Sequence, residues 1–286
     1  MTRGTLFVVA TPIGNLDDLS PRAQQVLQQA DLIAAEDTRH TGRLLSHFGV
    51  KTAQLALHDH NEERVVGRVL ERLQSGLNVA LVSDAGTPLV SDPGYRLVQA
   101  AHAHGITVSP VPGPSAVISA ISAAGLPSDR FCFEGFLPAK SDARLAVLRT
   151  LCKEARSMVF LESVHRIQDA LVDLVEIFGG DREAFLGREL TKLHEQCTAA
   201  SLADLVRLVQ NGDIPRKGEF VLVVRGARAA ALADPAISVR ELLRELMQSL
   251  PGKQAVDIVA RVAKQRRNEI YRLMLDMQGK DEESAP

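Results

Sequence analysis

Short apolar runs of strand length recur along the chain and alternate with longer segments that have helix-like ends. The runs are rich in β-branched residues, and most end in Gly, Pro, Asp or Ser. They cover residues 6–10, 79–82, 106–108, 158–161 and 220–224. Regular alternation of this kind predicts an α/β structure with a largely parallel sheet.

Capping residues mark several of the intervening helices. Ser20-Pro21 and Asp92-Pro93 each combine an N-cap residue with a Pro, which predicts helices over residues 21–30 and 95–104. Ser115 predicts a third helix, which Gly125 ends.

The pattern divides the chain into three parts. Residues 131–140 contain Gly135 and Pro138 and are interpreted as a junction, after which the alternation restarts. We therefore expect an N-terminal α/β domain over residues 1–130 and a second one over residues 131–227. The Ala-rich segment 228–236 suits a linker to a C-terminal helical module, 237–280, with helices over 239–250 and 254–276.

Composition narrows the class of protein. The net charge is -2 and aromatic residues make up 4%, so any RNA contact must use a local basic patch rather than a global field or rows of stacking rings. The three cysteines share no C-x-x-C spacing, and no apolar stretch reaches the ~18 residues of a membrane span. We expect a soluble, cytoplasmic protein without a membrane segment.

Common cofactor and nucleophile motifs are absent from the sequence. There is no G-x-G spacing, no G-x-x-x-x-G-K-[ST] loop and no G-x-S-x-G elbow, which disfavours a dehydrogenase, a nucleotide kinase and a hydrolase. The histidines of 58–60 and 102–104 suit solvated positions better than a metal site, so no metal is expected.

Three expected strands are followed by loops rich in Gly and Pro, at residues 11–16, 83–94 and 111–116. Such loops let the backbone approach a ligand closely. Ligands of open parallel sheets bind beyond the carboxyl ends of the strands, so three such loops favour a shared cleft over three ordinary tight turns.

Eight strings stand out in these loops and beyond, between residues 11 and 224. They are TPIGNLDDLS, AEDTRHT, SDAGTPLVSDPG, VPGPSA, FEGFLP, ESVHR, RELTKLHE and KGEFVLVV. Through these strings, which stand in family order, the chain resembles the tetrapyrrole-methylase superfamily of class III methyltransferases and, more closely, the branch that methylates ribosomal RNA. Members that act on porphyrinoids usually carry a Gly-x-Gly-Asp first loop, whereas here Gly14 is followed by Asn15-Leu16.

The resemblance implies two α/β domains with S-adenosylmethionine in the cleft between them, commonly in a homodimer. It implies methylation of a cytidine ribose 2′-hydroxyl of 16S rRNA in the decoding region of the small ribosomal subunit. It places Gly86, Thr87 and Val90 along the methionine part of the cofactor and Leu161 at the adenosine. The remaining cofactor-binding residues that it implies are Pro12, Gly14, Asp84, Ser115 and Ala116.

Three polar clusters are candidates for the chemistry, because a ribose hydroxyl benefits from a base or a stabilising cation. The third of them comprises Glu162, His165 and Arg166, next to the expected strand 158–161. In the first, Glu36 or Asp37 is the expected base or orienting group, and Arg39 the expected phosphate contact. In the second, Lys192 is expected to give electrostatic support, with Glu189 and Glu195 on the same face if the segment is helical. A structural ion-pair turn and a solvated helix start are the alternatives.

The C-terminal segment carries a local excess of positive charge. Between residues 253 and 272 six cations face two acids, a net of +4, which suits RNA backbone binding or, alternatively, a solvated face. Two other functions stay open: a tetrapyrrole or small-molecule methyltransferase of the same fold, and a non-catalytic ribosome-associated RNA-binding protein.

Overall fold

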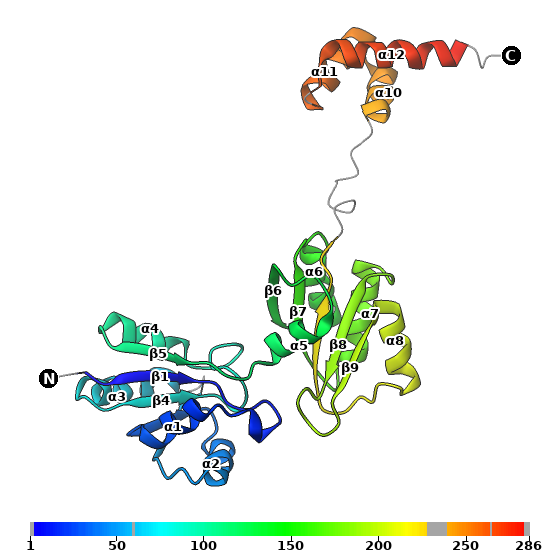
Figure 1. Ribbon diagram of the computed structural model, residues 1–286. Coiled ribbons are helices and arrows are strands. Elements are labelled where there is room, and N and C mark those ends of the chain that lie inside the picture. Colours follow the sequence, from blue (N-terminus) through cyan, green and yellow to red (C-terminus); the bar gives the residue numbers. More distant parts are fainter. Residues whose placement is uncertain (1–2, 59–60, 228–238, 264, 283–286) are drawn as a thin grey trace. The chain divides into compact units, whose positions relative to one another are not determined.

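The computed structural model describes residues 3–58, 61–227, 239–263 and 265–282 (Figure 1). The chain forms two compact units, Met1–Ala227 and Arg228–Pro286, which are described separately below. The segment predicted as a linker, 228–236, lies outside the described residues.

The first sheet is parallel throughout, as predicted. Its strand order is β3-β2-β4-β1-β5, and every neighbouring pair runs parallel. Its strands are β1 (Thr5–Val9), β2 (Leu32–Ala35), β3 (Gln54–Ala56), β4 (Val79–Val82) and β5 (Thr107–Val111).

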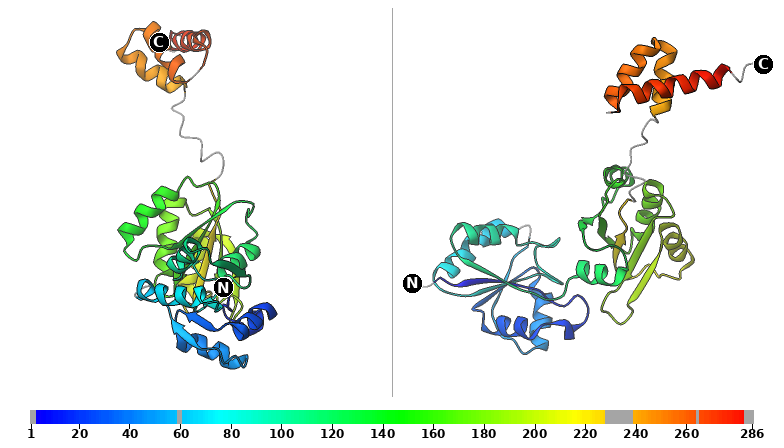
Figure 2. Two further views of the ribbon diagram at one scale, coloured as in Figure 1. Left: turned by 90° about the vertical axis from the view of Figure 1, so that its left-hand side faces the viewer. Right: turned by 45° about the horizontal axis from the view of Figure 1, so that its top comes forward.

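Helices cover both faces of this sheet, which explains why its central strands are apolar without interruption. Side chains alternate between two cores: Leu32 and Ala34 face the core beneath α3 and α4, and Ile33 and Ala35 the core beneath α1 and α2 (Figure 2). The helices are α1 (Pro21–Gln29), α2 (Thr38–His47), α3 (Glu62–Gln74) and α4 (Tyr95–Ala103).

The second sheet is mixed, with order β6-β7-β10-β8-β9, in which only β6 and β7 run parallel. Its strands are β6 (Phe131–Phe136), β7 (Ser157–Ser163), β8 (Glu183–Arg188), β9 (Gln196–Ser201) and β10 (Glu219–Val224). One face packs on α6 (Ser141–Leu151), α7 (Ile167–Phe178) and α8 (Leu202–Asn211).

The opposite face of the second sheet is covered by α5 (Ala116–Ala124). Val117 and Ala120 of this helix pack on Val159 and Phe185 of the sheet, and Ile13 from the first loop joins the same core. The chain thus leaves the first sheet at β5 and places its next helix on the second. The division of this unit at residue 130 stays a prediction.

Three sequence-based expectations were wrong. Residues 131–140 are not only a junction, because β6 occupies their first half and pairs with β7. Helix α4 is not capped by Asp92, since Gly94 at φ 120° is its N-cap and makes no side-chain bond. The expected helix 254–276 is two helices separated near Gln265.

The C-terminal unit is a three-helix module with a core of its own. It contains α10 (Val239–Ser249), α11 (Gly252–Val262) and α12 (Arg267–Glu282). Leu243, Val256 and Val259 are fully buried among these helices, with Ile270 and Met274 from α12 beside them.

Candidate functional site

The three Gly- and Pro-rich loops meet at the carboxyl edge of the first sheet and are tied together by the backbone. Thr11 and Gly86 exchange two backbone hydrogen bonds of 2.9 and 3.0 Å, which form an isolated bridge between the first and second loops. The Thr87 hydroxyl donates to the Pro114 carbonyl at 3.1 Å and fastens the second loop to the third. Gly86 has φ +82°, which favours glycine at this junction.

Two loops beside this edge hold non-glycine residues in the left-handed region. Leu89 and Ser91 have φ of 73° and 67°, and Glu189 and Thr191 have φ of 50° and 66°. Such conformations cost about 1–3 kcal/mol each and cluster at functional sites.

The larger of two adjoining cavities, of about 450 Å³, lies between these loops and the second sheet and is within the range for small-molecule sites. Its described lining residues include five carboxylates and no Lys, Arg or His. The carboxylates belong to Glu36, Asp84, Asp92, Glu162 and Glu219. The cavity therefore favours a ligand that carries positive charge.

Glu36 and Asp84 brace each other where β2 and β4 end side by side. The Asp84 N–H donates to Glu36 Oε2 at 3.3 Å, and the Asp37 N–H donates to Asp84 Oδ1 at 3.0 Å. These bonds fix two carboxylates on one wall of the larger cavity.

Glu162, on β7, is buried at 4% exposure and also lines the larger cavity. Its Oε1 accepts from the Ser163 N–H at 2.7 Å and pairs with the Arg166 guanidinium at 2.7 Å. Its Oε2 is buried and has no hydrogen-bond partner among the described residues. Leaving such an atom unsatisfied costs about 1–3 kcal/mol, which points to a donor on a bound ligand.

The smaller cavity, of about 310 Å³, adjoins the larger one and shares Ile13, Asp84, Ala85 and Glu219 with it. It also carries cations, unlike the larger cavity. They are Arg43 of α2 and Lys192 of the loop between β8 and β9, and His40 of α2 also lines this cavity.

Lys192 bridges two carboxylates at the boundary of the cavities. Its Nζ lies 2.9 Å from Glu189 Oε1 and 3.0 Å from Glu219 Oε2. Partial burial lowers the pKa of Lys192, but the hydrogen bonds with Glu189 and Glu219 outweigh this effect and raise it above its ordinary value. Lys192 is therefore a permanent cation at neutral pH.

The segment RELTKLHE is not helical, so the condition under which Glu189, Lys192 and Glu195 would share a helix face is not met. Glu189 and Thr191 have positive φ, and the Glu189 N–H bonds to the Glu219 carbonyl, so the segment is a turn stapled to β10. The predicted proximity of Glu189 and Lys192 holds, whereas Glu195 instead accepts from the Thr191 N–H at 2.6 Å.

Asp37 and Arg39 pair with each other at the start of α2. Asp37 is the N-cap and accepts from the Arg39 N–H at 2.8 Å, and its Oδ2 lies 2.7 Å from the Arg39 guanidinium. Hydrogen bonds from the Arg39 side chain and backbone hold the pKa of Asp37 well below its usual range. Neither residue lines either cavity.

The predicted cofactor-binding residues divide between the cavities. Pro12 and Gly14 line only the smaller cavity, and Asp84 lines both. A Cβ on Gly14 would lie 2.3 Å from Lys192 Cγ, so this glycine makes room for the lysine. Of the predicted site residues, those that line only the larger cavity are Gly86, Thr87, Val90, Ser115, Ala116 and Leu161, together with the predicted catalytic Glu36.

Sequence reasoning missed Arg43 and Glu219, and it placed His40 and Glu162 in candidate clusters without giving either a role of its own. Arg43 stands one helical turn beyond Arg39 on α2, a spacing that would have indicated a shared helix face. The orphaned oxygen of Glu162 has no sequence signal, because it depends on which donors surround it.

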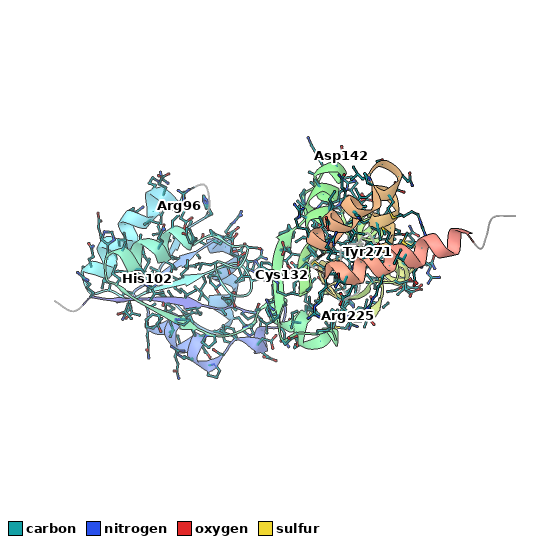
Figure 3. All side chains as sticks on the ribbon, turned by 90° about the horizontal axis from the view of Figure 1, so that it is seen from above. Arg96, His102, Cys132, Asp142, Arg225 and Tyr271 are labelled. Carbon is teal, nitrogen blue, oxygen red and sulfur yellow. The ribbon has the colours of Figure 1, made fainter. Side chains whose placement is uncertain are left out.

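In the described parts of the chain, no group of three or more His, Cys, Asp or Glu side chains is placed so that it could hold a metal ion. Among the residues labelled in Figure 3, His102 lies on α4 and Cys132 on β6. All three cysteines are free. Over the described residues, no helix has the length and apolar character to cross a membrane.

Comparison with curated proteins gives relatives over almost the whole chain. Ribosomal RNA small subunit methyltransferase I from Escherichia coli O157:H7 is 50% identical over 97% of this chain and 97% of that protein. The protein of that name from Xylella fastidiosa (strain Temecula1) is 52% identical over 94% and 98%, and that from Synechocystis is 44% identical over 96% and 99%.

Solved structures share the fold at lower identity. The methyltransferase CobJ has a TM-score of 0.59 and 22% identity, covering 78% of this chain and 95% of its own. Uroporphyrin-III C-methyltransferase from Thermus thermophilus, complexed with S-adenyl homocysteine, has a TM-score of 0.54 and 16% identity, covering 78% and 97%.

Two family models match different parts of the chain. The model of tetrapyrrole (corrin/porphyrin) methylases matches residues 5–206, and the RsmI C-terminal HTH domain matches residues 228–278. The chain therefore belongs to the tetrapyrrole methylase family and, within it, to the ribosomal RNA small subunit methyltransferase I group.

Proposed function

We propose that this protein transfers a methyl group from S-adenosylmethionine to the 2′-hydroxyl of a cytidine ribose in 16S rRNA, in the decoding region of the small ribosomal subunit. The names of its relatives support rRNA as the substrate. One observation of the structure carries the proposal. The only charged groups that line the larger cavity are carboxylates, and this cavity adjoins a smaller one that is also lined by cations. The first suits a cationic cofactor and the second an anionic polymer.

The larger cavity fits S-adenosylmethionine better than a nucleotide with phosphates. The sulfonium and the α-ammonium of this cofactor are cations, and Glu36, Asp84 and Glu162 give them carboxylates to face. The orphaned Oε2 of Glu162 would accept a hydrogen bond from a donor of the bound cofactor. When bound, S-adenosylmethionine supplies an electrophilic methyl group on a good leaving group.

The residues that the family resemblance implies as cofactor contacts are also the contacts proposed here. Gly86, Thr87 and Val90 border the methionine part, Ser115 and Ala116 the next turn, and Leu161 the adenosine. Pro12 and Gly14 support the site from the smaller cavity. The bridge between Thr11 and Gly86 holds the loops in register before any ligand arrives, which lowers the ordering cost of binding.

Among the predicted catalytic residues, Glu36 is the proposed base, because it lines the larger cavity and stands next to Asp84. Asp37 orients the start of α2, since its low pKa makes it a poor proton acceptor. Lys192 stabilises negative charge that develops on the ribose oxygen. Arg39 as an RNA phosphate contact stays a prediction.

The direct test is transfer of tritiated methyl groups from S-adenosylmethionine to 30S subunits, to 16S rRNA and to a porphyrinoid panel. Label recovered as a 2′-O-methylated cytidine is expected. Label on a porphyrinoid alone would replace the substrate and leave the cofactor standing. Calorimetry without any S-adenosylmethionine binding would instead indicate a non-catalytic RNA-binding protein.

A homodimer and a cytoplasmic location also stay predictions. Light scattering of the purified protein is expected to give twice the mass of the 31.0 kDa chain. A monomer at micromolar concentration would contradict the dimer without touching the proposed reaction.

A further inference from the structure

We propose that the smaller cavity binds the sugar-phosphate of the acceptor nucleotide, with Arg43 pairing with its phosphate and the Thr41 hydroxyl hydrogen-bonding to it. This inference rests on the proposed function, because it names the part of the protein that holds the RNA next to the cofactor. Its first support is position. The smaller cavity shares a wall with the larger one, so an acceptor within it lies beside the cofactor.

The Thr41 hydroxyl supplies the second support. Thr41 lies on α2, is buried at 2% exposure and lines the smaller cavity. Its Oγ1 has no hydrogen-bond partner among the described residues. A buried hydroxyl without a partner is costly, and a ligand oxygen within the cavity would satisfy it.

Arg43 supplies the third support for the proposal. Its exposed side chain lies half a turn from Thr41 on the same helix, and within the described chain no hydrogen bond or ion pair engages its guanidinium. The other charged groups of the cavity are already engaged: Lys192 binds Glu219, and Asp84 accepts from the Asp37 N–H. Arg43 is therefore the cation left for an incoming anion, and a guanidinium matches a phosphate in two parallel hydrogen bonds.

His40 lines the same cavity from the same helix. Apolar Pro12, Ile13 and Leu44 complete the cavity and suit the face of a sugar or base.

The experiment measures methyl transfer to 30S subunits with the full chain and with R43A, R43K and T41V. The KM for 30S subunits is expected to rise about tenfold in R43A and to recover partly in R43K, because a hydrogen bond to a charged group is worth about 1.5–3 kcal/mol. The salt dependence of that KM should fall by about one phosphate contact in R43A. Calorimetric affinity for S-adenosylhomocysteine should not change.

T41V separates binding from folding. Valine matches threonine in shape and removes the orphaned hydroxyl, so T41V should be at least as heat-stable as the parent while its KM for 30S subunits rises. A purely structural Thr41 predicts the reverse: lower stability and unchanged KM. The matched control is R68A on α3, an exposed arginine that lines neither cavity, which should behave as the parent.

An unchanged KM and salt dependence in R43A, with the parent active on 30S subunits, would overturn the inference and leave the proposed function intact. The same result would follow if R39A raised KM while R43A did not. A parent that methylates no RNA would instead overturn the proposed function. Equal loss of S-adenosylhomocysteine affinity in R43A would place Arg43 with the cofactor and also overturn the inference.

Discussion

At the scale of single residues, the Glu162 carboxylate is the strongest indication of a ligand site in the larger cavity. One carboxylate oxygen is bonded twice, and the other is buried and unsatisfied in the described structure. The sequence names this glutamate within ESVHR, but only the fold shows that its burial leaves one acceptor unused. A cationic ligand in the larger cavity accounts for both facts.

We expect E162Q to weaken S-adenosylmethionine binding about tenfold, because it replaces a charged hydrogen bond and keeps the shape of the side chain. Isothermal calorimetry measures the effect. E176Q, at an exposed glutamate of α7, is the matched control. Equal affinities for E162Q and the parent would show that the orphaned oxygen does not meet the cofactor.

Lys192 leads to a prediction on pH. Its raised pKa keeps it protonated up to values above its ordinary range, so the parent should show no loss of rate from this group between pH 6 and about 9. In K192H the cation exists only below about pH 6.5, so the methyl-transfer rate should fall as pH rises through that value. Rate profiles at saturating substrate test this, with K192Q as the variant that is neutral throughout. Identical profiles for K192H and K192Q would argue against an electrostatic role.

At the scale of secondary-structure elements, local signals predicted some parts well. The run 79–82 is β4, and the Ser20 and Ser115 caps and the Gly125 stop are where the sequence indicates. Strand β6 was missed because a glycine at position 135 is typical of a loop in the sequence. In the structure, Gly135 has φ +67° and lies at a register shift within the strand. For RELTKLHE, charge spacing left a helical conformation open, and it cannot reveal that Glu189 is held by β10.

The two serine caps give a matched pair of variants. S20A and S115A each remove an N-cap acceptor, from α1 and α5, and each should lower the free energy of unfolding by about 1 kcal/mol. Only Ser115 also lines the larger cavity, so only S115A should weaken S-adenosylmethionine binding. Urea titration and calorimetry check the two effects. A loss of affinity in S20A would mean that cap loss perturbs the site through the fold alone.

At the scale of the whole molecule, the C-terminal unit carries charge that the rest of the chain lacks. Arg267 of this unit is hydrogen-bonded to Asp257, whereas Arg261, Arg266 and Arg272 are exposed and have no such partner in the described residues. Lys264, one of the six predicted cations, lies outside the described residues. This segment matches the RsmI C-terminal HTH domain over residues 228–278.

We expect the triple variant R261Q/R266Q/R272Q to raise the KM for 30S subunits more than tenfold at physiological salt. The log–log salt slope should flatten by about two to three, because each lost phosphate contact contributes about 0.7–0.9. Affinity for S-adenosylhomocysteine should stay at the parent value, since its proposed site lies in Met1–Ala227. An unchanged salt slope would identify this surface as a solvated face without RNA contact.

Four non-glycine residues around the cavities have a left-handed backbone conformation, which has a consequence for protein engineering. Glycine at Ser91 or Thr191 would relieve local strain of about 1 kcal/mol or more, so a search for heat-resistant variants should find these positions early. The Leu89 side chain, in contrast, packs on the core, and that of Glu189 binds Lys192 and the Glu219 N–H. Ser91 lines the larger cavity, and Glu189 and Thr191 flank the turn that presents Lys192, so the same changes would loosen the groups around the reacting atoms. Variants selected only for heat resistance should therefore be more stable but turn over more slowly, because the strained residues of these two loops also hold the site in place.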